Sequence, residues 1–85
     1  MNRNELLKKL EEAKVNPGAY SLDGGSPGDT YVLSDEGYGN WSIYYSERGL
    51  RSEEKKFKSE SQACDEFYLW IIADPSTRWT PKNGF

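Results

Sequence analysis

The residues that could carry chemistry in this chain are mostly carboxylates, and histidine is absent. Without an imidazole, neither a Ser-His-Asp nor a Cys-His arrangement can activate a nucleophile, and a metal ion finds no imidazole ligand. The single cysteine, Cys64, can form neither an internal disulfide nor a thiolate zinc site, a usage that suits a reducing cytosol. We therefore expect no enzyme activity, no metal site and no cofactor.

The acidic side chains lack the spacing that acid–base catalysis or calcium binding requires. Asp65 and Glu66 are neighbours on a predicted helix and diverge by about 100°, while Asp35 and Glu36 fall in a predicted turn. Paired carboxylates do acid–base work only when a pocket separates their pKa values, and no EF-hand spacing is present. We interpret most of these carboxylates as solvated surface charge.

Two glycine-containing segments are superficially similar to nucleotide- and RNA-binding motifs. Residues 24–28 lack the Gly-Lys-Ser/Thr ending of a phosphate loop, and no predicted helix follows them. Residues 37–41, with the sequence GYGNW, are similar to the aromatic motif of an RNA-recognition sheet, but an acidic residue precedes them. We interpret both segments as turns.

Net charge and hydropathy narrow the class of partner. The net charge is −3 and the pI is near 4.9, so the chain lacks the positive charge that binds nucleic acid or anionic lipid. No apolar run approaches the ~20 residues of a membrane span, and no signal peptide precedes the first predicted helix. A basic protein in the cytoplasm is the partner that best matches this charge.

Periodic patterns predict the elements that position these residues. Apolar residues at helical spacing predict helices over residues 4–14, capped by Asn2 or Asn4, and 59–73, where Ser59 and Gln62 form a capping-box pattern. Cys64 lies on the apolar stripe of the second helix and is expected to be a buried, inert thiol. Alternating patterns predict four strands, over residues 19–22, 30–34, 41–46 and 50–57.

The fourth predicted strand is unusual in two respects. Leu50 and Phe57 differ in parity, so both can point inward only if the strand contains a bulge or a break. Its middle is charged, which is typical of an edge strand protected against pairing with other chains.

Short connections between the strands favour an antiparallel meander, since parallel strands need crossovers. We therefore predict a two-layer α+β sandwich in the order helix, four-stranded antiparallel sheet, helix, over residues 1–74. Residues 75–85 are predicted to form an irregular tail, with Trp79 folded back onto apolar surface. Both helices should cover one sheet face and leave the other open to solvent, with Ser21, Val32, Ser42 and Tyr44 on it.

Two sequence blocks point to a known family. Residues 41–51 (WSIYYSERGLR) and residues 57–64 (FKSESQAC), with Phe67 downstream, resemble a family of small bacterial immunity proteins encoded beside polymorphic or contact-dependent-inhibition toxins. Residues 20–24 are similar to the first strand of that family, so the resemblance covers about residues 19–72. It implies a cytoplasmic, non-enzymatic monomer that forms a 1:1 complex with the cognate toxin C-terminal domain and blocks its active site or substrate groove.

Many such toxins resemble nucleases with basic clefts, and an acidic inhibitor gains electrostatic steering toward such a cleft. The partner-binding candidates are exposed turn carboxylates, two aromatic anchors and a charged pair in the first block: Asp23, Asp29, Asp35, Glu36, Tyr38, Tyr44, Glu47 and Arg48. Tyr44 could equally serve packing, and Glu47 and Arg48 could equally form a structural ion pair or cap. The alternative function is a non-catalytic protein-interaction or regulatory module without a toxin partner.

Overall fold

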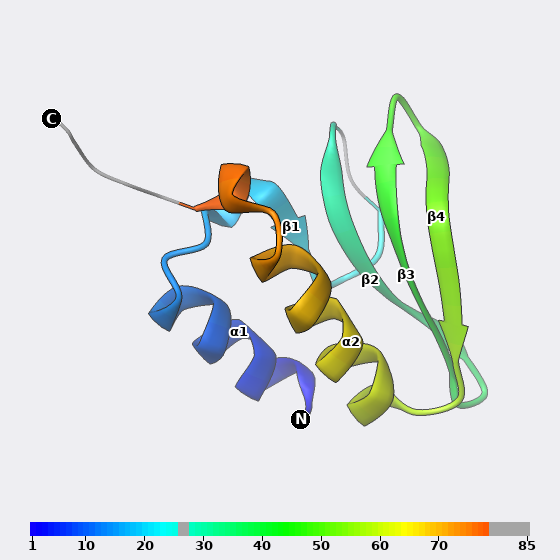
Figure 1. Cartoon of the computed structure of the whole chain (residues 1–85). Coiled ribbons are helices and arrows are strands. Elements are labelled where there is room, and N and C mark those ends of the chain that lie inside the picture. The colour runs from blue at the N-terminus through cyan, green and yellow to red at the C-terminus, as the bar shows by residue number, and fades with distance from the viewer. Residues whose placement is uncertain (26–27, 79–85) are drawn as a thin grey trace, which may run out of the picture.

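Residues 1–25 and 28–78 are described by a computed structural model, in which two helices lie on the same side of a four-stranded sheet (Figure 1). This arrangement confirms the α+β class and the helix–sheet–helix order. The elements are α1 (Arg3–Glu12), η1 (Pro17–Ala19), β1 (Tyr20–Ser21), β2 (Thr30–Gly37), β3 (Asn40–Glu47), β4 (Leu50–Phe57), α2 (Glu60–Ile72) and η2 (Pro75–Thr77), where η denotes a 3-10 helix.

Helix α1 begins with a reciprocal cap between Asn2 and Glu5. The backbone N–H of Glu5 donates to Asn2 Oδ1 at 2.8 Å, and the backbone N–H of Asn2 donates to Glu5 Oε1 at 2.9 Å. Of the two caps predicted, Asn2 is therefore the one used. Leu6 and Leu10 lie on the buried face of the helix, as their spacing predicts.

Helix α2 covers the sheet, and α1 packs beside α2 next to β1 (Figure 1). The N-terminal cap of α2 is Ser59, whose hydroxyl accepts a hydrogen bond from the Gln62 N–H at 3.1 Å. Its buried face meets β2, β3 and β4, and burial raises the pKa of the Cys64 thiol to about 11. The buried core consists of Leu6, Leu10, Val15, Leu33, Trp41, Ile43, Ala63, Cys64, Phe67 and Ile71.

Strands β2, β3 and β4 form the predicted antiparallel meander. Both hairpins have two-residue connections with positive φ at each position: 56° and 79° at Tyr38 and Gly39, and 52° and 81° at Arg48 and Gly49. These are the dihedral signs of type I′ turns, whose twist matches that of paired strands. The two turns lie at opposite ends of the sheet (Figure 1).

Strand β1 departs from the prediction, because it pairs with β2 in parallel and the sheet is therefore mixed. A parallel pair usually needs a long crossover. Here β1 has only two residues, and the chain continues beside β2 until the Gly24 N–H donates to the Leu33 carbonyl at 3.0 Å. The return to Thr30 then spans only a few residues, so no helix is needed to make it.

The bulge predicted for the fourth strand is confirmed in β4. The pairing of β3 with β4 shifts register between Ile43, opposite Lys55, and Tyr45, opposite Ser52. Glu53 takes the strained conformation there, with a φ of 56°. The bulge bends the edge strand and interrupts its free hydrogen-bonding edge, which discourages pairing with another chain.

The sheet face opposite the helices is closed, which contradicts the expectation of an open face. Val32 and Ser42 are fully buried, and Tyr44 is only 5% exposed. Charged side chains of the sheet itself lie over the centre of this face, as described below. At the β1 edge, Gly24 packs so closely on Ser34 that an added Cβ would lie 3.0 Å from the Ser34 hydroxyl.

The segment predicted as an irregular tail begins with the 3-10 helix Pro75–Thr77. The Asn16 N–H donates to the Thr77 carbonyl at 2.7 Å, and Val15 forms an isolated bridge with Arg78. These bonds attach the segment to the loop after α1. Trp79, for which we predict a contact with apolar surface, lies outside the described residues.

Candidate functional site

The predicted partner-binding residues do not share one surface. Strands of eight residues separate the two hairpin turns by about 25 Å. Asp35 and Glu36, which the sequence predicts in a turn, lie instead near the end of β2, and Tyr38 lies in the adjoining β2–β3 turn. The other end of the sheet carries Asp29, Glu47 and Arg48, since Thr30 pairs with Ser46. Asp23 lies beside α1, and Tyr44 lies in the middle of the face opposite the helices.

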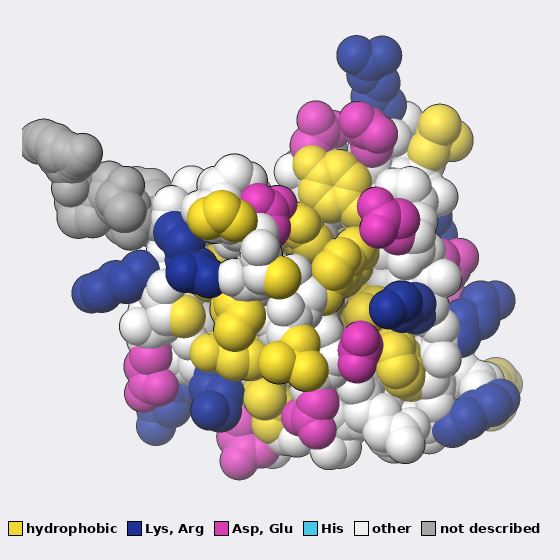
Figure 2. Space-filling view, in the orientation of Figure 1, with side chains coloured by type: hydrophobic (Ala, Val, Ile, Leu, Met, Phe, Trp, Pro, Cys, Tyr) yellow, Lys and Arg dark blue, Asp and Glu magenta, His cyan; other side chains and the backbone are white. Residues whose placement is uncertain are grey.

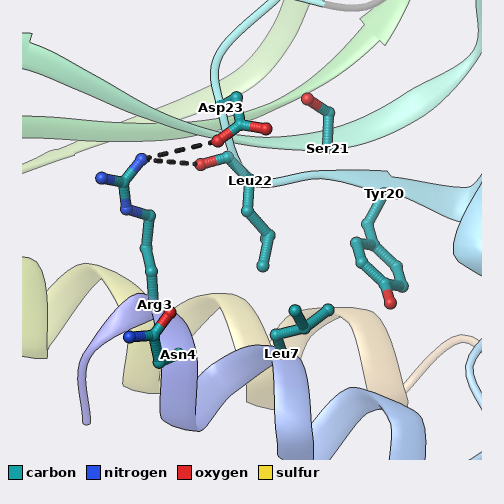
Figure 3. Close-up of a pocket in the computed structure, with 7 residues that line it drawn as sticks. All are labelled: Arg3, Asn4, Leu7, Tyr20, Ser21, Leu22 and Asp23. Atoms are coloured by element: carbon teal, nitrogen blue, oxygen red, sulfur yellow. Dashed lines mark hydrogen bonds and ion pairs between the residues drawn. The ribbon is translucent and has the colours of Figure 1, made fainter.

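Asp23 borders a cleft of about 490 Å³ between α1 and β1 (Figure 3). The Arg3 guanidinium donates to the Leu22 carbonyl at 3.2 Å and lies 3.7 Å from the Asp23 carboxylate. In Figure 3, Leu22 points down toward Leu7 of α1. The arginine is thus occupied by neutralising Asp23 and attaching α1 to the end of β1, so we regard this cleft as structural.

Tyr44 is covered by an arginine of the neighbouring strand. The Arg51 guanidinium carbon lies 4.2 Å from the centroid of the Tyr44 ring. The Nη1 nitrogen of that guanidinium lies 2.7 Å from the Glu54 carboxylate and 3.5 Å from the Glu36 carboxylate. A direct contact between Tyr44 and a partner would require Arg51 to move away, so in this structure Tyr44 serves packing.

Glu36 is tied into the same network by Ser34, whose hydroxyl donates to its carboxylate. That hydrogen bond, followed by the charge of Arg51, lowers the pKa of Glu36. Glu36 is therefore anionic and already paired. At the nearby turn, the Asp35 carboxylate accepts from the Gly37 N–H at 2.9 Å, and Tyr38 projects fully into solvent.

Three aromatic side chains lie together at the end of the sheet opposite the β2–β3 turn, on the face that the helices cover. Tyr31 and Tyr45 are cross-strand partners with ring centroids 5.1 Å apart, and Tyr31 also meets Trp70 of α2 at 4.7 Å. Both contacts are edge-to-face, which is a favourable arrangement for aromatic rings. The three side chains are only partly buried, because α2 ends nearby at Ile72.

Carboxylates surround these rings. Asp74 accepts a hydrogen bond from the Tyr31 hydroxyl at 2.8 Å. Burial, then this bond, then the charges of nearby groups that include Glu53 raise the pKa of Tyr31 to about 12. Burial, followed by the charges of Asp29, Glu47 and Asp74, raises the pKa of Tyr45. We call these seven residues the aromatic–acidic surface: Tyr31, Tyr45, Trp70, Asp29, Glu47, Glu53 and Asp74.

The carboxylates of this surface lack cationic partners. The ion pairs within residues 1–25 and 28–78 include none of its four acidic side chains. Helix α2 has no basic residue in its last turn. The nearby Arg78 donates instead to the Ile72 carbonyl. Hydrogen bonds from Ser76 and Tyr31 lower the pKa of Asp74, which keeps it anionic.

Figure 2 shows acidic side chains bordering a group of hydrophobic side chains over the end of α2 and the adjacent sheet. Leu50, the cross-strand partner of Glu47, is 72% exposed, and Leu69, next to Trp70, is 61% exposed. Aromatic residues at the centre of a surface, with apolar and charged residues at its edge, are typical of protein interfaces.

Two of the eight candidates, Asp29 and Glu47, belong to the aromatic–acidic surface. Arg48 is exposed at the adjacent turn, and no ion pair with Glu47 occurs in the described part of the chain. The other five residues of this surface are not among the predicted site residues: Tyr31, Tyr45, Trp70, Glu53 and Asp74. The alternating pattern places Tyr31 and Tyr45 on the covered face, and it gives no sign that α2 stops short of them.

No family model, curated protein or solved structure matches the chain. Within residues 1–25 and 28–78, no group of three or more cysteine, aspartate or glutamate side chains is placed to hold a metal ion. Among the helices of the same residues, none is both long enough and apolar enough to cross a membrane.

Proposed function

We propose that the protein is a non-catalytic inhibitor that binds a basic protein through the aromatic–acidic surface. Its partner is the toxin domain encoded beside it, and binding blocks the active site or substrate groove of that domain. The observation that supports this proposal is the group of four carboxylates without cationic partners around three partly exposed aromatic rings.

The physical argument concerns what such a surface gains on binding. Asp29, Glu47 and Asp74 all act electrostatically on Tyr45, and their combined negative field attracts a positively charged partner and steers its approach. Tyrosine and tryptophan provide large contact area for little loss of side-chain entropy. The edge-to-face contacts already fix the orientation of the rings, which lowers the entropy that binding must remove.

The resemblance to immunity proteins supports the same proposal. The block of residues 41–51, one of the two that carry the resemblance, contributes Tyr45 and Glu47 to the aromatic–acidic surface. The family would use an acidic protein to cover a basic active-site groove, and the net charge of −3 suits that role.

The experiment is co-expression with the C-terminal domain of the neighbouring toxin gene. We expect rescue from growth arrest and a 1:1 complex in size-exclusion chromatography with light scattering. The variant Glu47→Lys should weaken the complex about tenfold or more. The matched control is Glu12→Lys, which makes the same charge change at the exposed end of α1.

Three outcomes would contradict the proposal. Failure to rescue and to form a complex would favour the interaction or regulatory module without a toxin partner. Equal weakening by Glu47→Lys and Glu12→Lys would show that net charge alone matters. Weakening by Asp35→Lys with Tyr38→Ala, but not by Glu47→Lys, would place the binding surface at the β2–β3 turn.

A further inference from the structure

We infer that the aromatic–acidic surface recognises one arginine side chain of its protein partner, stacked on the ring of Tyr45 between Asp29 and Glu47. The inference rests on the proposed function for the identity of the partner, but the arginine site itself follows from a comparison within β3. Tyr44 and Tyr45 are adjacent and point to opposite faces of the same strand.

On the Tyr44 side, the protein supplies its own arginine. Arg51 lies over the ring at 4.2 Å, and two carboxylates contact its Nη1 nitrogen, Glu54 at 2.7 Å and Glu36 at 3.5 Å. The attraction between the cation and the ring quadrupole and the two charge-assisted contacts act together. This arrangement shows which chemistry satisfies a tyrosine ring flanked by carboxylates in this sheet.

On the Tyr45 side, the ring and the carboxylates are present and the cation is missing. The charges that raise the pKa of Tyr45, after burial, are those of Asp29, Glu47 and Asp74. These residues come from the start of β2, the end of β3 and the segment after α2, so three elements direct negative charge toward one ring. In the described part of the chain, the basic side chains that form ion pairs are Arg3, Arg51 and Lys55, and each pairs elsewhere.

The geometry favours arginine over lysine. Two of the carboxylates lie beyond the same end of Tyr45: Glu47 is two residues along β3, and Asp29 directly precedes Thr30, which pairs with Ser46. A planar guanidinium can stack on an aromatic ring and donate in its plane to carboxylates on two sides, whereas an ammonium group is a compact, strongly hydrated charge. On the other face, Arg51 lies over the Tyr44 ring and contacts Glu54 and Glu36 through the same nitrogen, Nη1.

The surroundings keep the Tyr45 site in shape before binding. Tyr31 holds its hydroxyl on Asp74 at 2.8 Å and presses edge-on against both Tyr45 and Trp70. Tyr45 itself is only partly buried. A preorganised aromatic surface in a negative field is the complement of an arginine that projects from a basic protein.

The test titrates the isolated protein with acetyl-Gly-Arg-Gly-amide and follows backbone and indole resonances by NMR. We expect saturable, millimolar binding with shifts at Tyr45, Glu47 and Trp70. The same peptide with citrulline replacing arginine should produce no shifts, and the lysine peptide should bind at least about threefold more weakly because it cannot both stack and bridge. Glu47→Gln and Asp29→Asn should each weaken binding of the arginine peptide, while Glu12→Gln should leave it unchanged.

Tyr45→Ala should abolish binding and Tyr45→Phe should retain it. Tyr45→Ala removes a partly buried ring, so this variant could fail to fold. In that case Glu47→Gln and Asp29→Asn, which keep the ring, still test the inference. Equal binding of the citrulline peptide, equal binding of the lysine peptide, or shifts confined to Asp35 and Tyr38 would each overturn the inference. Binding of arginine without any complex with the neighbouring toxin would instead overturn the proposed function and leave the arginine site standing.

Discussion

The two faces of the sheet are closed by different means. On one face, apolar residues of α2 such as Phe67 and Ile71 exclude water from β2 and β3. On the other face, Arg51 lies over Tyr44 and is paired with two glutamates, and Val32 is fully buried, although no helix packs there. A small domain can therefore use one helical layer and let charged side chains with long apolar stems close the remaining face.

The difference also explains where a partner can bind. On the face that Arg51 covers, which we call the charged face, the carboxylates of Glu36 and Glu54 are paired with Arg51. The helix-covered face ends in the aromatic–acidic surface, where four carboxylates lack cationic partners within the described residues. Helix α2 has 13 residues and spans about 20 Å, while strands of eight residues span about 26 Å. The sheet is longer than the helix that covers it, and the uncovered end carries Tyr45.

Truncating the apolar layer should have the largest effect. Phe67 is fully buried and contacts Tyr31 edge-on, so Phe67→Ala should lower the free energy of unfolding by about 3–5 kcal/mol, measured by urea denaturation. The control is Leu69→Ala on the same helix, which is 61% exposed and should change it by about 0.5 kcal/mol or less. Similar losses in the two variants would mean that α2 does not close this face as described.

Removing the charged cover should have a smaller effect. Arg51→Met keeps an apolar stem over Tyr44 but removes the guanidinium and leaves Glu36 and Glu54 without their cation. We expect a loss of about 1–2 kcal/mol. Lys55→Met is the control on the same strand, because its pair with Glu66 is exposed and 3.6 Å long and should contribute less than about 0.5 kcal/mol. Equal effects would show that Arg51 is not what closes this face.

Local patterns predicted much of the fold. The 3.6-residue periodicity located both helices to within two residues, the capping residue Ser59 was identified correctly, and the parity of Leu50 and Phe57 indicated the bulge. These features depend on residues close together in the sequence. The direction of β1 was wrong because a two-residue strand carries almost no pattern, and its pairing is set by contacts such as that of Gly24 with Leu33.

The site was harder to predict than the fold. The closed charged face depends on Arg51 meeting Glu36 from two strands away, a contact that no local pattern indicates. The aromatic–acidic surface depends on where α2 ends relative to the sheet, and residue alternation alone assigns Tyr31 and Tyr45 to the core. Of that surface, the candidates include only Asp29, as a predicted turn carboxylate, and Glu47, as part of the block that resembles the immunity family.

Alkaline pH should affect the uncovered end through Tyr31. Its pKa is about 12 in the folded protein and 10 without the fold, so its contribution to stability is complete below pH 10 and is lost as pH rises from 10 to 12. The unfolding free energy should therefore fall over that range, and less steeply in Tyr31→Phe. Phenolate absorbance should show a late titration step that Tyr31→Phe abolishes and Tyr38→Phe, at the exposed turn, retains. Retention of the late step in Tyr31→Phe would contradict this assignment.

The smallest effect is expected at Ser42, on the charged face. Its hydroxyl is fully buried. Among the described residues, it is the buried side-chain group that has no hydrogen-bond partner of ordinary geometry. It nevertheless helps to lower the pKa of Glu36. A buried hydroxyl without a partner costs about 1–3 kcal/mol. Ser42→Ala should therefore leave the unfolding free energy unchanged or raise it by up to about 1 kcal/mol, measured by urea denaturation.

Ser34, directly opposite Ser42 on β2, is the matched control, because its hydroxyl donates to Glu36. Ser34→Ala should lower the unfolding free energy by about 1 kcal/mol and raise the pKa of Glu36, since the carboxylate loses its largest stabilising contact. The same one-atom deletion at two facing positions should thus have opposite effects. If Ser42→Ala instead destabilises the protein as much as Ser34→Ala, both hydroxyls support Glu36, and the charged face is a fully satisfied network.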